Sequence, residues 1–489
     1  MVIPSQSIRS DTELREYCGA FGIYSFSGKN VASDIYFGLM NLQHRGQDAA
    51  GAAVFDGKQI RVEKGLGFVP EVLNPGAIAK LAGSVGIGHV RYPTIGAGGA
   101  EDAQPFIAEA AGKKFALAHN GNLSNYGKAR KRVEDQGFRF CSTCDAELVL
   151  AAYAEHYAKT KDYFEAARGM MGALDGSYSV VLVTDDGDLV AFRDPHSIRP
   201  LCWGRDDDKI VIASESVALD IINCPLSGDV APGEVVVVSK GKVTRKVVTG
   251  KQPRHCMFEY VYFSRPDSKI DGKWVYEVRS NLGRALARAA PVDADVVVAV
   301  PDTARSAVEG YSRESGIPVS EGLIKNRYIG RTFIMPSQKK REDAVRLKLN
   351  AVRHVVEGKR VVLIDDSIVR GTTMGPIVKL VRAAGAKEIH LRITCPPIMA
   401  PCFYGVDIPT YNELIATKKS VDEICKAVGA DTLVYQTIED LVKAIGMKKE
   451  ELCTGCLDEA YPTEIGAKIA KKLKETGSKE GVRAWEEKE

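Results

Sequence analysis

The sequence predicts a protein of mixed α/β and α+β class made of two successive halves. From Cys18 to about residue 252, short apolar segments separated by Gly and Asp are typical of β-strands joined by turns. From about residue 257, strand patterns alternate with helical ones, which indicates βαβ units and a parallel sheet. A chain of 489 residues is long enough for such a division.

The individual elements follow from the spacing of apolar residues. In the first half we expect strands at Gly19–Ser25, Ser84–His89, Ser179–Thr184, Leu189–Arg193, Ile210–Ala213 and Glu234–Ser239, with a helix at Ala146–His156 and a linker at Thr249–Arg254. In the second half we expect strands at Val296–Val300, Val361–Ile364 and Ile389–Ile393, a helix ending at Ser315, another at Ile377–Ala384, and a charged helical tail.

Composition excludes several classes of protein. The 66 basic and 63 acidic residues give a net charge of +3, which offers no argument for a nucleic-acid or membrane partner. No apolar run approaches membrane-spanning length, and the first residues lack the apolar core of a signal peptide. We therefore expect a cytoplasmic protein whose eleven cysteines are reduced.

The most informative stretch is VVLIDDSIVRGTT at residues 361–373. An apolar strand ends at two carboxylates, and a loop then leads into a helix. Backbone N–H groups at a helix start bind phosphate, and carboxylates bind sugar hydroxyls or Mg²⁺. A surface turn with two acids would be the simpler interpretation, and the loop lacks the Gly-Lys-Ser/Thr of a Walker A motif.

The run from Asp365 to Thr373 resembles the phosphoribosyl-pyrophosphate (PRPP) signature of the type I phosphoribosyltransferases. This resemblance implies a parallel-sheet domain in which Asp365, Asp366 and Thr303 bind Mg²⁺. It implies that PRPP is held by Asp365, Asp366, Ser367, Arg370, Gly371, Thr372 and Thr373. Lys325, Arg327 and Arg331 resemble the basic loop that closes over PRPP, although an ordinary basic loop has the same composition.

A second chemistry is indicated around Cys18-Gly19-Ala20-Phe21-Gly22. A cysteine beside a strand is usually a small apolar residue. Here His89-Val90-Arg91-Tyr92, His119-Asn120-Gly121-Asn122 and Asp145 follow in order. Together they resemble the glutaminase domain of the N-terminal-nucleophile (Ntn) amidotransferases, which have the Ntn-hydrolase αββα sandwich fold.

The glutaminase resemblance implies a role for each of these residues. Cys18 is the nucleophile, Asn120 and the N–H of Gly121 stabilise the oxyanion, and Arg91, Tyr92 and Asp145 bind glutamine. In this family the cysteine is the first residue of the mature chain, because a free α-amino group has a pKa low enough to act as a base. We therefore expect residues 1–17 to be a propeptide.

A glutaminase followed by a PRPP site resembles the amidophosphoribosyltransferase family over almost the full chain. The implied reaction is glutamine + PRPP + water → 5-phosphoribosylamine + glutamate + pyrophosphate, the first step of de novo purine synthesis, with ammonia channelled between two sites. The expected ranges are a propeptide at 1–17, glutaminase at 18–252, phosphoribosyltransferase at 253–445 and a tail at 446–489.

Four further cysteines point to a metal. Cys453-Thr454-Gly455-Cys456 is a CxxC pair, which alone would fit zinc or no metal. The contexts of Cys256 and Cys402 resemble the iron–sulfur-containing branch of the family, which implies that Cys256, Cys402, Cys453 and Cys456 hold a structural [4Fe–4S] cluster. Cys141 and Cys144 are interpreted as packing residues near the glutamine site.

Three alternative interpretations compete with this one. Another amidotransferase would not explain Asp365–Thr373, and a PRPP-sensing regulator would need a DNA-binding element. A PRPP-binding homologue without catalysis would not need Cys18, Arg91 and Asn120 together. The family resemblance further implies purine nucleotides as feedback inhibitors and a homodimer or homotetramer; the sequence does not locate the nucleotide sites.

Overall fold

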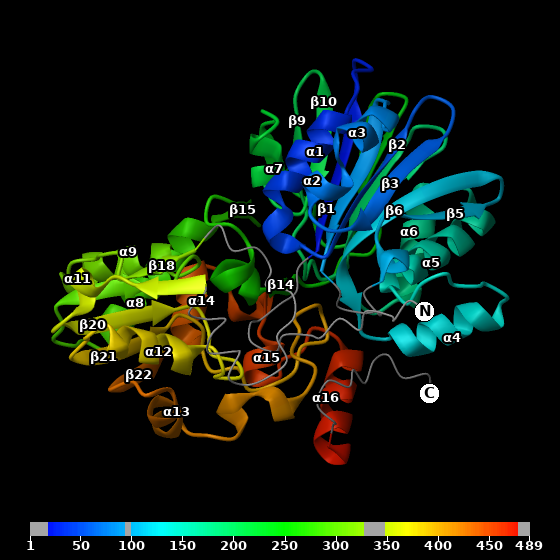
Figure 1. Cartoon of the computed structure of the whole chain (residues 1–489). Coiled ribbons are helices and arrows are strands. Elements are labelled where there is room, and N and C mark those ends of the chain that lie inside the picture. Colours follow the sequence, from blue (N-terminus) through cyan, green and yellow to red (C-terminus); the bar gives the residue numbers. More distant parts are fainter. Residues whose placement is uncertain (1–17, 93–98, 327–347, 478–489) are drawn as a thin grey trace, which may run out of the picture. The chain divides into compact units, whose positions relative to one another are not determined.

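The computed structural model describes residues 18–92, 99–326 and 348–477 (Figure 1). Contacts divide the chain into two compact units. The N-terminal unit is formed by the described residues of Arg15–Val275, Pro401–Thr410 and Met447–Glu489, and the parallel-sheet unit by those of Tyr276–Ala400 and Tyr411–Gly446.

These units differ from the ranges expected from the sequence. Residues 253–275 and 401–410, expected in the phosphoribosyltransferase domain, pack with the N-terminal unit, as does the described part of the tail. Local composition marks the linker near residue 252, but it cannot show where a later segment packs. The expected propeptide at 1–17 lies outside the described residues.

Two sheets form the centre of the N-terminal unit. The first has the order β11-β9-β10-β1-β4-β2-β3, with β1 Gly19–Ser25, β2 Ala49–Phe55, β3 Ile60–Leu66, β4 Val85–Arg91, β9 Cys202–Arg205, β10 Lys209–Ala213 and β11 Leu226–Asp229. The second has the order β13-β12-β8-β7-β6-β5, with β5 Phe106–Ala110, β6 Lys113–Leu123, β7 Gly176–Thr184, β8 Leu189–Arg193, β12 Glu234–Ser239 and β13 Lys242–Val247.

Helices cover the outer face of each sheet. The helix α1 (Ala32–Asn41) packs on the first sheet, and α5 (Asp145–Thr160) and α6 (Tyr163–Ala173) belong to the side of the second. Side chains alternate between the layers, because Phe21 faces the α1 core whereas Ala20 faces the core between the sheets. The expected αββα sandwich is confirmed.

Shorter elements complete this unit. They are α2 Val69–Val72, α3 Pro75–Lys80, α4 Tyr126–Asp135, α7 Val217–Asp220, β14 His255–Cys256, a π-helix at Glu259–Phe263, β15 Lys269–Ile270, β16 Lys273–Trp274, β23 Leu452–Cys453, α15 Gly455–Asp458 and α16 Glu464–Thr476. In the part of the chain that the structure describes, no helix is both long and apolar enough to cross a membrane.

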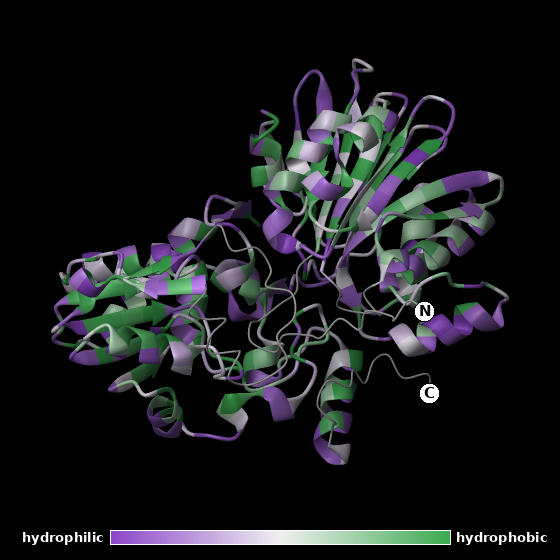
Figure 2. Ribbon diagram, in the orientation of Figure 1, coloured by the Kyte–Doolittle hydropathy of each residue, from purple (hydrophilic) through white to green (hydrophobic). Residues whose placement is uncertain are grey.

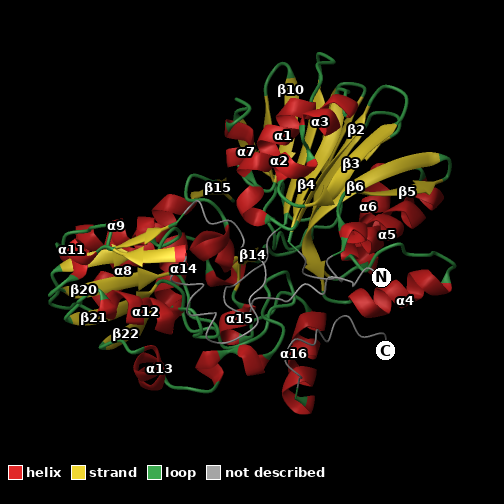
Figure 3. Ribbon diagram, viewed as in Figure 1, coloured by secondary structure: helices red, strands yellow, loops and turns green. Residues whose placement is uncertain are grey.

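The other unit is built on a parallel sheet of order β17-β20-β21-β22, as the βαβ pattern predicts (Figure 3). Its strands are β17 Val296–Ala299, β20 Arg360–Asp365, β21 Glu388–Ile393 and β22 Thr432–Tyr435, with a small hairpin of β18 Leu323–Lys325 and β19 Leu349–Ala351. Its helices are α8 Val275–Ala289, α9 Arg305–Ser315, α11 Arg353–Val356, α12 Met374–Ala383, α13 Val421–Val428 and α14 Ile438–Ile445.

Hydrophobic residues line the sheets of both units (Figure 2). In the parallel-sheet unit, Val297, Val362 and Ile364 pack in one core with helix residues such as Leu286 and Tyr311. Strands buried on both faces read as continuous apolar runs. This explains why Val361–Ile364 was recognisable from sequence, and why the polar residues directly after it stand out.

Candidate active sites

Cys18 lies immediately before β1, beside the end of β4. The two strands pair antiparallel with Gly19 opposite Val90, which brings Cys18 close to Arg91 and Tyr92. The Cys18 thiol donates a hydrogen bond to the main-chain oxygen of Tyr92 at 3.5 Å and is only 6% exposed. The thiol therefore lies buried at a strand end, beside the residues that follow β4.

Arg91 is buried at the end of β4 with its guanidinium facing Asp102. The Nη2–Oδ2 distance is 3.5 Å, and neither side chain is accessible to solvent by more than 2%. Burial alone would lower the pKa of Arg91, but the nearby Cys144, Asp102, Cys18 and Asp145 together raise it. Arg91 thus interacts electrostatically with both Cys18 and Asp145, so these three predicted residues surround one site.

Asp145 is the first residue of α5, where the helix dipole favours a negative charge. Its carboxylate accepts the N–H of Leu123 at 3.3 Å and lies 3.7 Å from Nδ1 of His119. Burial lowers the pKa of His119, although Asp145 opposes that shift. The carboxylate is therefore fixed against β6, the strand that carries Asn120.

Asn120 and Gly121 lie near the end of β6. The Asn120 Nδ2 donates to Ser214 Oγ at 3.3 Å, and the same oxygen accepts the N–H of Ala20 at 3.0 Å. Asn120 is thereby tied to the strand that follows Cys18. A Cβ at Gly121 would lie 2.0 Å from the carbonyl oxygen of Ser177, so only glycine fits there.

Two residues of this site, Asp102 and Ser214, are not predicted from the sequence. Asp102 orients Arg91 and also accepts the N–H of Thr143 at 3.0 Å. Ser214 links Asn120 to Ala20 across the two sheets. Neither belongs to a motif, and each acquires its role from a partner that is distant in sequence.

In the parallel-sheet unit, the predicted magnesium residues meet at the carboxyl ends of two neighbouring strands. Asp365 ends β20, and the carboxylate of the following Asp366 accepts hydrogen bonds from the hydroxyls of Thr303 and Ser367, the latter at 2.6 Å. Burial raises the pKa of Asp366, and both hydroxyls oppose that shift. Oxygen ligands suited to Mg²⁺ are thus already grouped here.

The predicted phosphate loop leads into α12 as expected. Gly371 has φ +74°, a conformation that glycine adopts at little cost, and Thr373 directly precedes the helix. Thr372 is exposed. The Arg370 Nε donates to Glu413 Oε2 at 3.0 Å, which holds the guanidinium beside the loop. A ten-residue helix opening at such a loop offers its N–H groups to an anion.

The basic loop predicted to close over PRPP carries three cations, of which only Lys325 belongs to the described residues. Lys325 ends β18, and its Nζ lies 3.2 Å from Asp302, the residue before Thr303. Arg327 and Arg331 lie outside the described residues. The lysine is therefore placed beside the loop that carries a predicted magnesium ligand.

The four predicted cluster cysteines all belong to the N-terminal unit, although the chain between them passes through the other unit. Each is 7–8% exposed. Cys256 and Cys453 are direct partners in the parallel pair β14–β23, and the N–H of Tyr404 lies 3.4 Å from Cys402 Sγ. Cys456 is in α15. Cys395 instead belongs to the parallel-sheet unit.

Charge around these thiols is consistent with a shared environment. Burial raises the pKa of Cys256 to about 12, with Arg199 opposing the shift, and Cys256 and Cys402 both add to the raised pKa of the buried Cys453 thiol. Arg199 is itself buried and interacts with Cys256 and Cys402. Among the described residues, no three His, Cys, Asp or Glu side chains group as ligands of a single metal ion.

Cys141 and Cys144 differ in their surroundings. Cys141 is exposed, whereas Cys144 is buried with its Sγ 3.8 Å from both Gln104 Nε2 and Asp145 Oδ1. Burial raises the pKa of Cys144 to beyond the physiological range. A buried thiol beside Asp145 agrees with the interpretation of Cys144 as a packing residue, whereas the exposed Cys141 does not fit that interpretation.

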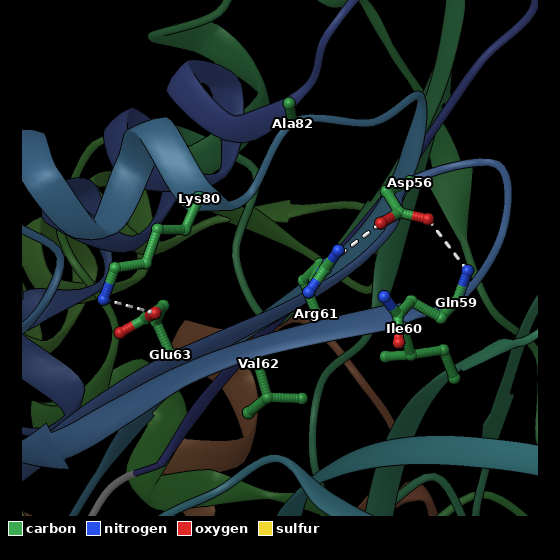
Figure 4. A pocket seen from close by; sticks show the side chains of 8 residues that line it. All are labelled: Asp56, Gln59, Ile60, Arg61, Val62, Glu63, Lys80 and Ala82. Carbon is green, nitrogen blue, oxygen red and sulfur yellow. Dashed lines mark hydrogen bonds and ion pairs between the residues drawn. The ribbon is translucent and has the colours of Figure 1, made fainter.

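A hollow of about 650 Å³ lies elsewhere, on the hairpin of β2 and β3 (Figure 4). Its charged residues are paired, with Arg61 Nε 2.9 Å from Asp56 and Lys80 Nζ 3.0 Å from Glu63. None of the residues predicted for the amide site or the transferase site lines this hollow. We therefore assign no chemistry to it.

Comparison with known proteins decides between the alternatives. Residues 90–220 match the glutamine amidotransferase domain family and residues 276–401 the phosphoribosyl transferase domain family. The chain is 50% identical to the amidophosphoribosyltransferase of Methanothermobacter thermautotrophicus over 463 residues, 94% of this chain and 97% of the relative. It is 46% identical to that of Bacillus subtilis over 462 residues, 92% and 95% of the two chains.

The chain belongs to the amidophosphoribosyltransferase family. A solved structure agrees: the glutamine PRPP amidotransferase of B. subtilis, complexed with ADP and GMP, superposes with a TM-score of 0.84 at 43% identity, over 92% of this chain and 98% of that one. This chain contains both predicted domains. The expected fold class and the expected type of enzyme are thereby confirmed.

Proposed function

We infer that this chain converts glutamine, PRPP and water into 5-phosphoribosylamine, glutamate and pyrophosphate, and so opens purine biosynthesis. One observation carries the inference. Relatives of this activity match 92–94% of the chain, and the chain holds both the Cys18 motif and the Asp365–Thr373 loop. A binding homologue without catalysis would not require a buried nucleophile, Arg91 and Asn120 in one site.

In the amide site, we assign the attack on the glutamine side-chain carbonyl to the Cys18 sulfur. Asn120 Nδ2 and the Gly121 N–H stabilise the oxyanion, a type of contact that contributes roughly 3–4 kcal/mol per donor. Collapse releases ammonia and leaves a thioester, which water hydrolyses to glutamate. Arg91 binds the α-carboxylate through its planar guanidinium and Asp145 binds the α-ammonium, while Tyr92 flanks the thiol.

The Cys18 thiol needs a base, and its own α-amino group is the proposed one. That group exists only after residues 1–17 are removed, so the proposal includes cleavage between Tyr17 and Cys18. Mass spectrometry of the active enzyme is expected to give a chain beginning at Cys18. Full activity in a chain that retains residues 1–17 would contradict this step.

In the transferase site, Asp365, Asp366 and Thr303 are the proposed ligands of Mg²⁺. The fit lies in the donors, because one hydroxyl and one buried carboxylate already meet there. Bound Mg²⁺ would neutralise charge on the pyrophosphate group. Ser367 and the backbone of Arg370–Thr373 are assigned to the 5-phosphate. Lys325, Arg327 and Arg331 are assigned to the charge of the pyrophosphate leaving group. Ammonia reaches this site without release to bulk water.

We propose that Cys256, Cys402, Cys453 and Cys456 hold a [4Fe–4S] cluster. Four thiolates on four different irons are further apart than ligands of one ion, and the buried Arg199 compensates negative charge beside them. Anaerobic purification is expected to give brown protein with iron and sulfide, lost in Cys453→Ser and retained in the control Cys425→Ser. Colourless wild-type protein without iron would refute the cluster.

Regulation and assembly complete the proposal. The B. subtilis relative was solved with ADP and GMP, which supports purine nucleotides as feedback inhibitors of this chain. We further propose a homodimer or homotetramer in the cytoplasm, as the family resemblance implies. Inhibition assays with purine nucleotides and sedimentation at several protein concentrations test these two points.

The decisive experiment compares two nitrogen donors. Cys18→Ala is expected to lose glutamine-dependent synthesis by at least about 1,000-fold, because the covalent nucleophile is gone. Ammonia-dependent synthesis is expected to survive. Cys224→Ala removes a buried thiol from the same unit outside the site and serves as the control. Equal loss with both donors in folded Cys18→Ala protein would refute the division into two sites.

A further inference from the structure

A short segment of the N-terminal unit is held by side chains from two strands of the second sheet and from the connection that follows β8. Asn122 Nδ2 donates to the carbonyl oxygen of Phe403 at 2.9 Å. Ser177 Oγ and Arg199 Nε both donate to the carbonyl oxygen of Tyr404, at 2.8 and 3.0 Å. All five residues are at least 98% buried. Two consecutive carbonyls are thus satisfied by three donors in the interior of the unit.

The clamp also holds the main chain of β6. Asn122 and Ser177 are opposite each other in the pairing of β6 with β7, and the Ser177 hydroxyl accepts the N–H of Asn122 at 3.2 Å. Residue 122 is therefore fixed through both its backbone and its side chain. A buried polar network whose members all have partners is rigid, and each lost partner leaves a costly unpaired group.

Beyond Leu117, the described part of the sheet pairs β6 with β7 alone. The ladder between β5 and β6 ends at the pair Phe106–Leu117, whereas β7 accompanies β6 as far as Leu123. The stretch with Asn120 and Gly121 is thus paired in the sheet along one edge. Its position on the other edge depends on side-chain contacts, such as Gln104 Oε1 accepting the His119 N–H at 2.7 Å.

Asn122 directly follows the two proposed oxyanion donors. Residues two apart on a strand point to the same face, so the Asn120 and Asn122 amides leave β6 on one side. Asn120 reaches Ser214, and Asn122 reaches Phe403. A displacement of residue 122 along or away from the sheet moves the Gly121 N–H with it, because the two are consecutive.

We propose that Asn122 is a positioning residue of the amide site. Held on the Phe403 carbonyl and on Ser177, it fixes the end of β6 so that Asn120 Nδ2 and the Gly121 N–H stay aimed at the oxyanion. Asn122 contacts none of the reacting atoms and acts through its neighbours. This inference rests on the proposed roles of Cys18, Asn120 and Gly121.

The test measures glutamine hydrolysis and ammonia-dependent synthesis in Asn122→Ala and Asn122→Asp. Misplacement of oxyanion donors is expected to lower kcat for glutamine about 10- to 100-fold. Ammonia-dependent synthesis is expected to stay within about threefold, which shows that the protein is folded. The matched control is Asn125→Ala, which removes a similar bond from Asn125 Nδ2 to the carbonyl of Ala173 at 3.2 Å.

The pH dependence distinguishes positioning from loss of packing. The buried carboxyl of Asn122→Asp has a raised pKa, and only its protonated form can donate to the Phe403 carbonyl. The ratio of its kcat to that of the wild type is therefore expected to rise as pH falls. The same ratio for Asn122→Ala is expected to stay level, because alanine has no proton to regain.

The outcomes are separable. Wild-type enzyme that releases no glutamate would refute the proposed function itself. With active wild type, three results would each overturn the positioning role. The first is a kcat for glutamine within threefold of the wild type in both Asn122 variants, and the second is a loss of ammonia-dependent synthesis equal to the loss with glutamine. The third is a ratio of Asn122→Asp kcat to wild-type kcat that does not change with pH. If the Asn122 variants fail to fold, Ser177→Ala takes their place, because it removes the hydroxyl that contacts both Asn122 and Tyr404. This variant is expected to lose glutamine hydrolysis and keep ammonia-dependent synthesis. If it keeps both activities, the positioning role is overturned.

Discussion

The two candidate sites are built in opposite ways. Around Cys18, the side chains of Arg91, Asn120 and Asp145 are each at most 4% exposed, and each makes a hydrogen bond or ion pair with another residue. In the transferase site, Lys325 is 46% exposed at its side chain and Thr372 is exposed. The first site is closed, whereas the second combines the buried Asp366 with groups that face solvent.

The substrates explain this difference. The amide reaction develops one new charge on a small oxygen, and donors fixed in a dry environment stabilise such a charge most strongly. PRPP brings many charges of its own, and the polar groups that bind such a ligand are hydrated before it arrives. Changes in the closed site should therefore act on geometry and folding, and changes in the open site on binding.

The largest expected effect tests whether the sites are separable. Asp366→Asn removes a proposed Mg²⁺ ligand and is expected to lower synthesis at least about 1,000-fold with glutamine and with ammonia. Glutamate release from glutamine should persist, because the closed site is unchanged. The exposed carboxylate of Asp422 gives a control in Asp422→Asn. Normal pyrophosphate release by Asp366→Asn would show that this carboxylate is dispensable.

The second test concerns folding of the closed unit. Arg45 has no exposed side-chain surface and pairs with both Glu215 and Glu259. Arg45→Met leaves two buried carboxylates without this cation and is expected to cost about 3–5 kcal/mol in the free energy of unfolding. Denaturant unfolding measures it. Arg61→Met, at an exposed pair, is the control and should barely move the midpoint; equal shifts would contradict the comparison.

A smaller effect depends on pH. Burial favours neutral Glu215, but Arg45 and His44 outweigh burial and lower its pKa below the usual value of 4.5. Its ionised form therefore stabilises the fold above about pH 4.5, and this contribution is lost as pH falls towards the lowered pKa. Glu215→Gln is expected to cost about 2 kcal/mol at pH 7 and less at pH 3. A penalty that grows on acidification would reverse this assignment.

The smallest expected effect is in the open site. Arg370→Lys replaces a planar guanidinium held by Glu413 with a compact ammonium, and is expected to raise the KM for PRPP about tenfold. Glutamine hydrolysis without PRPP should be unchanged. Steady-state kinetics for both substrates measure this. A tenfold loss of glutamine hydrolysis in Arg370→Lys would show that the transferase site and the amide site do not act independently.

Local patterns predicted the elements well where apolar residues repeat regularly. The expected strands Gly19–Ser25, Leu189–Arg193 and Glu234–Ser239 agree with β1, β8 and β12. The helix expected at Ala146–His156 lies inside α5, which begins one residue earlier at Asp145 and runs on to Thr160, where Lys161 caps it in the left-handed conformation. Boundaries depend on caps, which the apolar repeat does not contain.

The residues of the candidate sites also fall into two groups, those that motifs predicted and those that they did not. Cys18, Arg91, Asn120 and Asp145 were predicted from separate motifs, and the structure places them around one site. The supporting residues were not predicted, because Asp102 has no meaning apart from Arg91. Likewise the Asn122–Phe403 contact joins positions 281 residues apart, and no local pattern specifies such a pair.

By itself, the sequence determined the order of the two folds and the chemistry of each site, because strand periodicity and short motifs are local properties of the chain. Only the tertiary structure decided which groups support that chemistry and where segments such as 401–410 pack. The physical reason is that burial and hydrogen bonding are settled between distant residues, when the chain closes and each buried polar group must find a partner.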